Sequence, residues 1–249
     1  MIGIRLIFSL LAWGAIGLWT GLITVLIGLT YLIHPVVDPD RSAMHWLASV
    51  WGRTLVSMAP GTRVQVFGRQ HLPHGRAVIL VANHQSYVDI PALYFLRWQF
   101  KWMADVGLFR IPFFGWAMRM AGYIPVHRGD PKEARVSLER ARQWLKRGIP
   151  VFLFPEGTRS HTGLFGRFQT GGFRLAVSTG TSIVPVVLVG TRRLLPRGAW
   201  IFRFNVHPQI HVLPPITPAS SSLKEVRRLA QRVRSEMTSV YRQHLKDVR

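Results

Sequence analysis

The run AVILVA at residues 77–82 passes directly into NHQSYVD at residues 83–89, so a wholly apolar segment ends in a burst of polar side chains. An unbroken apolar run rich in β-branched residues indicates a strand that is buried on both faces of a sheet. Pro91 and a new apolar segment follow, which places the polar residues in a turn between a strand and a helix. Side chains at strand ends and in loops commonly carry function. This turn is therefore the first candidate site.

His84 and Asp89 are the side chains of this turn that suit acid–base chemistry. A histidine titrates near neutral pH and can take a proton from a hydroxyl group, and a neighbouring carboxylate can fix its tautomer. Residues five apart lie on different faces of a regular helix, so these two side chains can meet only across a turn. Such pairs also arise by chance or as helix caps, and spacing alone is therefore a weak indication of catalysis.

Short apolar runs, most of them bounded by glycine or proline, alternate with amphipathic helical patterns from about residue 61 onward. This alternation is typical of an α/β domain with a largely buried sheet. We therefore expect an α/β fold in which a central mixed sheet is flanked by helices. Besides 77–82, the predicted strands are residues 64–67, 151–154, 183–189, 201–206 and 210–213.

Two helices of this domain have clear signals. Residues 131–147 follow a capping Asp130, end at Gly148 and lead into a predicted strand. The last helix begins after Ser222 and combines an apolar stripe with a strongly basic face. That face is either ordinary solvated surface or a contact for anionic lipid headgroups.

The amino-terminal segment has a different character. The only acidic or basic side chain between Arg5 and Asp38 is His34, and the apolar run at residues 6–33 is long enough to span a bilayer. The run is too long for the apolar core of a signal peptide and no clear cleavage region follows it, so we expect it to stay in the mature protein.

Residues 42–58 mix tryptophan and aliphatic residues with His45 and Arg53, a composition that favours an interfacial helix. The GxxxG formed by Gly17 and Gly21 would let a second helix approach closely. One straight span and two helices that dip into one leaflet are both compatible with this pattern. We divide the chain into a membrane-anchoring helical segment at residues 1–58 and an α/β domain at residues 59–249.

The net charge is +21 and the chain has no cysteine, which excludes disulfides and thiolate nucleophiles. So strong a positive charge implies an anionic partner. No nucleic-acid-binding motif is readable, and a positive mean hydropathy of +0.17 favours an anionic bilayer surface over nucleic acid. A basic membrane-surface or nucleic-acid-binding protein without catalytic activity is the non-enzymatic alternative.

Two further polar segments follow apolar runs. In FPEGTRS at residues 154–160, Gly157 and Arg159 could receive a phosphate, and Glu156 could orient the arginine or accept from a substrate hydroxyl. An ordinary turn with solvated charges is the alternative. In GYIPVHR at residues 122–128, the arginine ends a short strand-like run.

These segments, in this order and spacing, resemble the glycerolipid acyltransferase superfamily, and most closely the bacterial 1-acyl-glycerol-3-phosphate acyltransferases. Residues 83–89 resemble the NHxxxxD block of that family, residues 122–128 its second block and residues 154–160 its FPEGTRS block. Residues 183–187 resemble its IVPVV block, and the likeness extends over about residues 61–215.

The resemblance implies that His84 deprotonates the acceptor hydroxyl, which attacks the thioester of acyl-CoA or acyl-carrier protein, while Asp89 orients the histidine. It implies no acyl-enzyme, no cofactor and no metal ion. Aromatic residues around Tyr94, Phe95, Phe109, Phe113 and Trp116 are candidate linings of an acyl tunnel, although core packing is the commoner use of such residues. The family's acceptor-binding positions correspond to Arg128, Glu156, Gly157, Thr158 and Arg159.

The resemblance also implies a place and a product: the cytosolic face of the inner (cytoplasmic) membrane, and phosphatidic acid for phospholipid biosynthesis. Two departures bear on the acceptor. Asp105 stands where many relatives carry a lysine, and Gln169 and Thr170 stand where they carry a lysine pair. Because both changes remove positive charge, another lysolipid such as lyso-ornithine lipid is an alternative to lysophosphatidic acid.

Overall fold

The computed structural model describes residues 2–127 and 129–245, and in this part of the chain a seven-stranded sheet has the order β1-β7-β6-β2-β5-β3-β4. Neighbouring strands are parallel except β6 and β7, which are antiparallel. This arrangement confirms the predicted mixed sheet. The strands are β1 Gln65–Phe67, β2 Ile79–Ala82, β3 Lys101–Asp105, β4 Ile124–Val126, β5 Val151–Leu153, β6 Ile183–Val189 and β7 Gln209–Val212.

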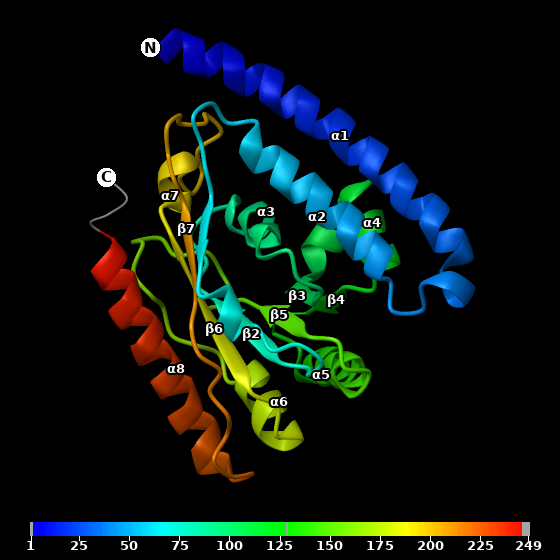
Figure 1. Cartoon of the computed structure of the whole chain (residues 1–249), viewed down its shortest axis with the longest axis vertical. Coiled ribbons are helices and arrows are strands. Elements are labelled where there is room, and N and C mark those ends of the chain that lie inside the picture. Colours follow the sequence, from blue (N-terminus) through cyan, green and yellow to red (C-terminus); the bar gives the residue numbers. More distant parts are fainter. Residues whose placement is uncertain (1, 128, 246–249) are drawn as a thin grey trace.

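Helices cover both faces of this sheet (Figure 1). The α-helices are α1 Ile2–Val37, α2 Ser42–Ser57, α3 Asp89–Leu93, α4 Phe114–Met120, α5 Pro131–Lys146, α6 Gly171–Thr179, α7 Thr191–Leu194 and α8 Leu223–His244. Short 3-10 helices are η1 Arg69–His71, η2 Tyr94–Leu96 and η3 Val106–Arg110. The helices predicted at 131–147 and after Ser222 are thus confirmed as α5 and α8.

The central strand β2 divides the core into two clusters. Leu80 and Ala82 pack with residues of α1, α2, α3 and α4, whereas Ile79 and Val81 pack with residues of α5, α6 and α8. Alternate residues of a strand point to opposite faces, so a fully apolar β2 serves both clusters. As a result α8 lies on the side of the sheet opposite α1 and α2 (Figure 1).

Three strand assignments differ from the sequence prediction. Strand β3 was not predicted, β4 lies in the strand-like run at residues 122–128 that was not counted among the predicted strands, and residues 201–206 form bends rather than a strand. The backbone of that segment bonds to other partners: Phe202 N donates to Ser9 Oγ at 2.9 Å and Arg203 N to Leu194 O at 2.9 Å. The ring of Phe202 packs against Phe8 and Trp13 of α1, so this apolar residue serves helix packing instead.

Helix α1 is long and apolar enough, by length and composition, to cross a membrane, which is consistent with membrane association. Helix α1 lies along the domain and contacts it through both its first half and its second half (Figure 1). Trp13 Nε1 donates to Trp200 O at 2.8 Å, and Thr24 Oγ1 to Phe113 O at 3.2 Å. Most of its other large apolar side chains are exposed, Leu18 by 80% and Leu32 by 76%. The helix thus offers an apolar surface along one side of the domain.

The close helix approach predicted at Gly17 and Gly21 is wrong for the described part of the chain, since a Cβ at either position would meet nothing within 4 Å. It occurs instead at Gly52 of α2, where a Cβ would lie 2.4 Å from Tyr94 Cδ2 and 3.0 Å from Pro91 Cα. Only a glycine therefore lets α2 lie this close to the segment that follows Asp89.

Candidate active site

The polar turn after β2 is fixed to the neighbouring strand by Asn83. Its side-chain Nδ2 donates to Leu188 O at 2.9 Å, and its Oδ1 accepts from Leu188 N at 2.8 Å. The amide is fully buried, and these two bonds extend the pairing of β2 and β6 by one step. The next residue, His84, is thereby placed at the carboxyl end of the central strand.

His84 and Asp89 meet across the turn, as the sequence predicted. His84 Nδ1 lies 2.7 Å from Asp89 Oδ2, and the same oxygen accepts the backbone N–H groups of Gln85 at 2.5 Å and Ser86 at 2.8 Å. The turn therefore wraps around a fully buried carboxylate. Because a carboxylate accepts, the neutral imidazole carries its proton on Nδ1, and Nε2 is the basic nitrogen.

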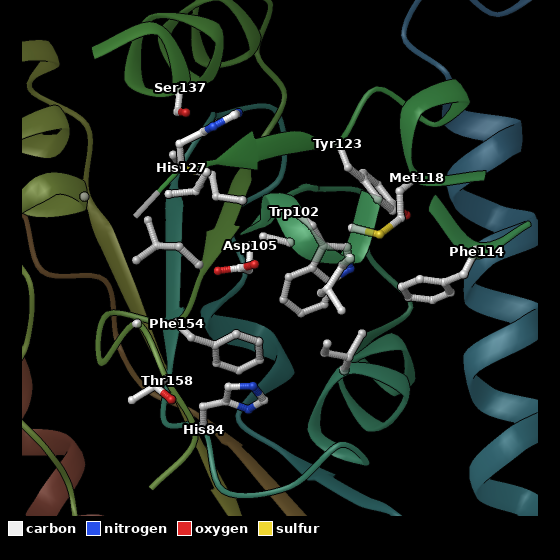
Figure 2. Close-up of a pocket in the computed structure, with 18 of the residues that line it drawn as sticks. His84, Trp102, Asp105, Phe114, Met118, Tyr123, His127, Ser137, Phe154 and Thr158 are labelled. Carbon is white, nitrogen blue, oxygen red and sulfur yellow. The ribbon is translucent and has the colours of Figure 1, made fainter. Parts of the chain in front are cut away.

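A cavity of about 630 Å³ begins at His84 (Figure 2). The ring of Phe154 stacks on His84 with centroids 4.1 Å apart and planes at 14°. Trp102 and Tyr123 line the cavity further from the histidine, and most of the surface is apolar. An apolar chain would fit this space with one end beside the histidine.

The carboxylate of Glu156 binds the main chain of the turn that carries His84. It is buried, its Oε1 accepts the backbone N–H of His84 at 3.1 Å, and its Oε2 accepts that of Gly166 at 2.8 Å. Burial raises the pKa of Glu156, and the two backbone bonds oppose that change. Sequence reasoning expected this carboxylate to orient Arg159 or to meet a substrate hydroxyl, whereas both oxygens bond to backbone amides.

Among the other predicted acceptor-binding residues that the structure describes, only Gly157 and Thr158 are part of the cavity wall. Gly157 has a φ of +71°, which favours glycine. The guanidinium of Arg159 lies over the ring of Tyr87, 3.5 Å from the centroid, outside the residues that line the cavity. Arg128 lies outside the described residues.

Several contributors to the site were missed by sequence reasoning. Gln85 Nε2 donates to Gly163 O at 3.0 Å and its Oε1 accepts from Tyr241 Oη at 3.3 Å, so α8 braces the turn. The amino-terminal helices also contribute to the cavity wall, through Ile23 of α1 and Trp51 of α2 among others. These contacts join residues far apart in the chain, and no local pattern could have indicated them.

Of the aromatic residues named as candidate tunnel linings, Tyr94 lines the cavity, whereas Phe95, Phe109, Phe113 and Trp116 are not among its lining residues. That an acyl chain occupies this cavity stays a prediction. Asp105 and Gln169, one residue from each of the two departures from the family pattern, line the cavity, whereas Thr170 is not among its lining residues. Within residues 2–127 and 129–245, no group of three or more His, Asp and Glu side chains could hold a metal ion. The absence of a cofactor stays a prediction.

A histidine that opens to an apolar cavity at the carboxyl end of a central strand, paired with a buried aspartate, defines the class of the protein. The chain belongs to the acyltransferase family, whose family model matches residues 63–189. It is 40% identical over 181 residues to the chloroplastic 1-acyl-sn-glycerol-3-phosphate acyltransferase of Arabidopsis thaliana, a match that covers 71% of this chain and 50% of that protein.

Two further similarities point the same way. The chain is 32% identical over 179 residues to a 1-acyl-sn-glycerol-3-phosphate acyltransferase of Pseudomonas aeruginosa, covering 69% of this chain and 67% of that one. Its fold is similar to the crystal structure of the 1-acyl-sn-glycerophosphate acyltransferase of Thermotoga maritima, with a TM-score of 0.81, 26% identity and coverage of 98% and 97%. The chain spans about half the length of the chloroplastic relatives.

Proposed function

We propose that the protein transfers a fatty acyl group from acyl-CoA or acyl-carrier protein to the free hydroxyl of 1-acyl-sn-glycerol-3-phosphate, giving phosphatidic acid for phospholipid biosynthesis. The observation that carries the proposal is the 2.7 Å contact of His84 Nδ1 with Asp89 beside an apolar cavity. Members of the same family with this activity support the choice of acceptor.

The chemistry follows from the free nitrogen of the histidine. Nε2 of His84 takes the proton of the acceptor hydroxyl as its oxygen attacks the thioester carbonyl, and Asp89 stabilises the resulting imidazolium. When the tetrahedral intermediate collapses, the C–S bond breaks and the imidazolium returns the proton to the thiolate. Ser86 is unsuited as a nucleophile, because its Oγ donates to Leu195 O at 2.7 Å and is buried.

Arg159, which follows Gly157 and Thr158 of the cavity wall in the chain, would hold the phosphate of the acceptor, and Arg128, outside the described residues, is the second arginine proposed for this role. Nη1 of Arg159 is buried and makes no hydrogen bond to any described residue, so it keeps a donor for a ligand. The carboxylate of Asp105 in the cavity wall keeps a lysolipid without a phosphate monoester, such as lyso-ornithine lipid, as the second candidate.

Placement at the cytosolic face of the inner membrane fits this chemistry, because the acceptor and product are lipids whereas the donors are soluble. Residues 1–58 would anchor the protein and residues 59–249 would carry the reaction. The exposed apolar side of α1 supports the anchor, and Ile23 and Ile27 of the same helix line the cavity. Acyl chains could therefore enter from the bilayer along α1.

The test is a panel assay of the purified full chain with labelled acyl-CoA and acyl-carrier protein. Lysophosphatidic acid, glycerol-3-phosphate and lyso-ornithine lipid are offered as acceptors, with His84→Ala as the control that should lose nearly all transfer while keeping its fold. A preference for lyso-ornithine lipid would mean that this lipid, and not lysophosphatidic acid, is the acceptor. Tight, sequence-independent binding of duplex DNA without any acyl transfer would favour the non-enzymatic alternative.

A further inference from the structure

A second hollow, of about 430 Å³, lies on the outer side of α2 and η2 and shares no residue with the catalytic cavity. Its basic groups come from two elements, since Arg53 belongs to α2 and Arg97 directly follows η2. The rest of its lining is Val50, Thr54, Ser57, Met58 and Phe95. The known site does not account for this hollow.

The two guanidinium groups face it without an acidic partner. Among the described residues, neither Arg53 nor Arg97 forms an ion pair, and Arg53 Nε donates only to Ser49 O, at 3.2 Å. Partial burial, and then the charge of Arg97, lowers the pKa of Arg53, which indicates that the two like charges act on each other. An anion between them would relieve this repulsion.

The backbone holds the pair in place. The contact of Gly52 with Tyr94 and Pro91 brings α2 against η2, and thus brings Arg53 toward Arg97. Arg97 has φ 50° and ψ 44°, a left-handed conformation that costs roughly 1 kcal/mol for a residue other than glycine. Two arginines are therefore kept together against both charge repulsion and backbone strain.

The donors in this hollow match a phosphate group. A guanidinium presents paired N–H donors in a plane that fits two phosphate oxygens. The hydroxyls of Thr54 and Ser57 line the same hollow and add donors of the kind that phosphates accept. A carboxylate could also pair with the arginines, but two guanidiniums and two hydroxyls suit the larger oxygen number of a phosphate.

The surroundings indicate that the phosphate belongs to a membrane lipid. Trp46, Val50, Arg53 and Ser57 follow one another at spacings of four, three and four residues, so they share one face of α2. The side chain of Trp46 on this face is 61% exposed, and tryptophan favours the boundary between headgroups and hydrocarbon. Helix α2 also lies beside the exposed apolar helix α1 (Figure 1).

We propose that the hollow between Arg53 and Arg97 binds the phosphate of an anionic membrane phospholipid, as a docking site separate from the catalytic cavity. The proposal rests on the membrane placement given under Proposed function. The inner sides of the same two elements line the catalytic cavity through Trp51 and Tyr94. A bound lipid would therefore hold α2 against the segment that starts at Asp89.

The test is flotation of the full chain with vesicles of phosphatidylcholine alone and of phosphatidylcholine mixed with phosphatidylglycerol. Adding phosphatidylglycerol should increase the binding of the unchanged protein to the vesicles. In the double variant Arg53→Gln/Arg97→Gln this gain in binding should be about 25-fold smaller, because each arginine near an anionic surface contributes about fivefold. Binding to phosphatidylcholine alone, which α1 supplies, should not change. An unchanged gain in this variant would overturn the proposal.

The matched control is Arg227→Gln/Arg228→Gln, which removes the same charge from exposed positions of α8 on the other side of the sheet. This pair should keep the gain, and an equal loss in both pairs would mean that only net charge matters. Inorganic phosphate should release the protein from mixed vesicles no better than chloride at equal ionic strength. Release that is specific to phosphate and lost in Arg53→Gln/Arg97→Gln would assign the site to free phosphate instead.

A second variant distinguishes the loss of the lipid site from a folding defect. Val50→Glu places a carboxylate in the hollow one turn from Arg53, where a helical acid–base pair is favourable. This variant should keep the thermal midpoint and lose the gain, whereas a retained gain in the folded variant would contradict the site. Flotation measures binding and not turnover, so its failure and the failure of the acyl-transfer assay are distinguishable.

Discussion

Glu156 Oε1 accepts the backbone N–H of His84 over 3.1 Å, so the FPEGTRS segment holds the catalytic turn by its main chain. The other oxygen of Glu156 bonds to Gly166 N at 2.8 Å and thus fixes the loop that follows. One buried carboxylate therefore ties together two segments that are 72 residues apart in the chain. This geometry gives Glu156 a positioning role, and because it also lines the cavity, its predicted contact with the acceptor stays a prediction.

For Glu156→Gln, we expect kcat to fall about 100-fold, because the NH2 group that replaces one oxygen cannot accept a hydrogen bond. One of the two backbone N–H groups then loses its acceptor, and the turn that carries His84 shifts. The matched control is Glu225→Gln on α8, another buried glutamate that accepts a backbone N–H, from Ala219 at 3.0 Å. Both variants should lose some thermal stability. Steady-state kinetics decide the matter, and an equal effect of the two substitutions on kcat would contradict the positioning role.

For Asp89→Asn, acyl transfer should fall by about three to four orders of magnitude, because the amide can no longer fix the Nδ1–H tautomer or stabilise the imidazolium. Single-turnover measurements of transfer test this directly. Asp130→Asn is the control, since Asp130 caps α5 through Lys132 N and asparagine caps equally well. Activity of Asp89→Asn near that of the control would remove the carboxylate from the mechanism.

For Arg159→Ala, the KM for lysophosphatidic acid should rise about 10- to 100-fold, the value of a charge-assisted bond to phosphate, while the KM for the acyl donor stays the same. Tyr87→Phe keeps the ring beneath the guanidinium and should leave both constants unchanged. Kinetics with each substrate varied in turn separate the two effects. An unchanged dependence on acceptor concentration would exclude Arg159 from phosphate binding.

For Gly52→Ala, we expect a loss of about 1 to 3 kcal/mol in the free energy of unfolding, because the new methyl group would overlap the ring of Tyr94. Gly14→Ala on α1 is the matched control. A Cβ there meets nothing within 4 Å, so alanine should be neutral or slightly stabilising within the helix. Denaturant unfolding in detergent compares the two, and similar stabilities would refute the close packing of α2.

The stability of the protein should depend on pH through Lys101. Burial, and then the charge of Arg41, lowers the pKa of this fully buried lysine from 10.5 to about 7. Between these values the unfolded chain holds a proton that the folded chain has released, so the free energy of unfolding should rise with pH at up to about 1.4 kcal/mol per unit. Below about pH 7 both states are protonated and this contribution is constant.

Lys101→Met removes the titrating group and should flatten that rise. Denaturant unfolding of both proteins between pH 7 and pH 10 gives the difference in slope, which cancels the contributions of other groups. The absolute stability of the variant is not the readout, because Nζ of Lys101 also donates to Ala121 O at 3.0 Å. Equal slopes for the two proteins would show that the lysine titrates alike in the folded and unfolded states.

Local sequence patterns predicted the elements that depend on neighbouring residues. The apolar run before Asn83 predicted the central strand, and the cap at Asp130 predicted α5, since both signals lie within a few residues. Strand β3 was missed because the charged residues Lys101 and Asp105 at its ends interrupt the apolar pattern that indicates a buried strand. A lysine is tolerated there because its ammonium group donates to Ala121 O at 3.0 Å and to Arg41 O at 3.4 Å and lies over the ring of Trp144.

The amino-acid sequence by itself determined the α/β class, the place of His84 and Asp89 in one turn, and the family to which the chain belongs. These features are encoded within short segments, where spacing and hydrophobic pattern are sufficient. Only the tertiary structure decided that Glu156 bonds to the main chain of His84, that α1 and α2 form part of the cavity wall, and that Arg53 and Arg97 line one hollow. Each of these relations joins segments that are distant in the chain, and their contacts exist only once the sheet and its helices have packed together.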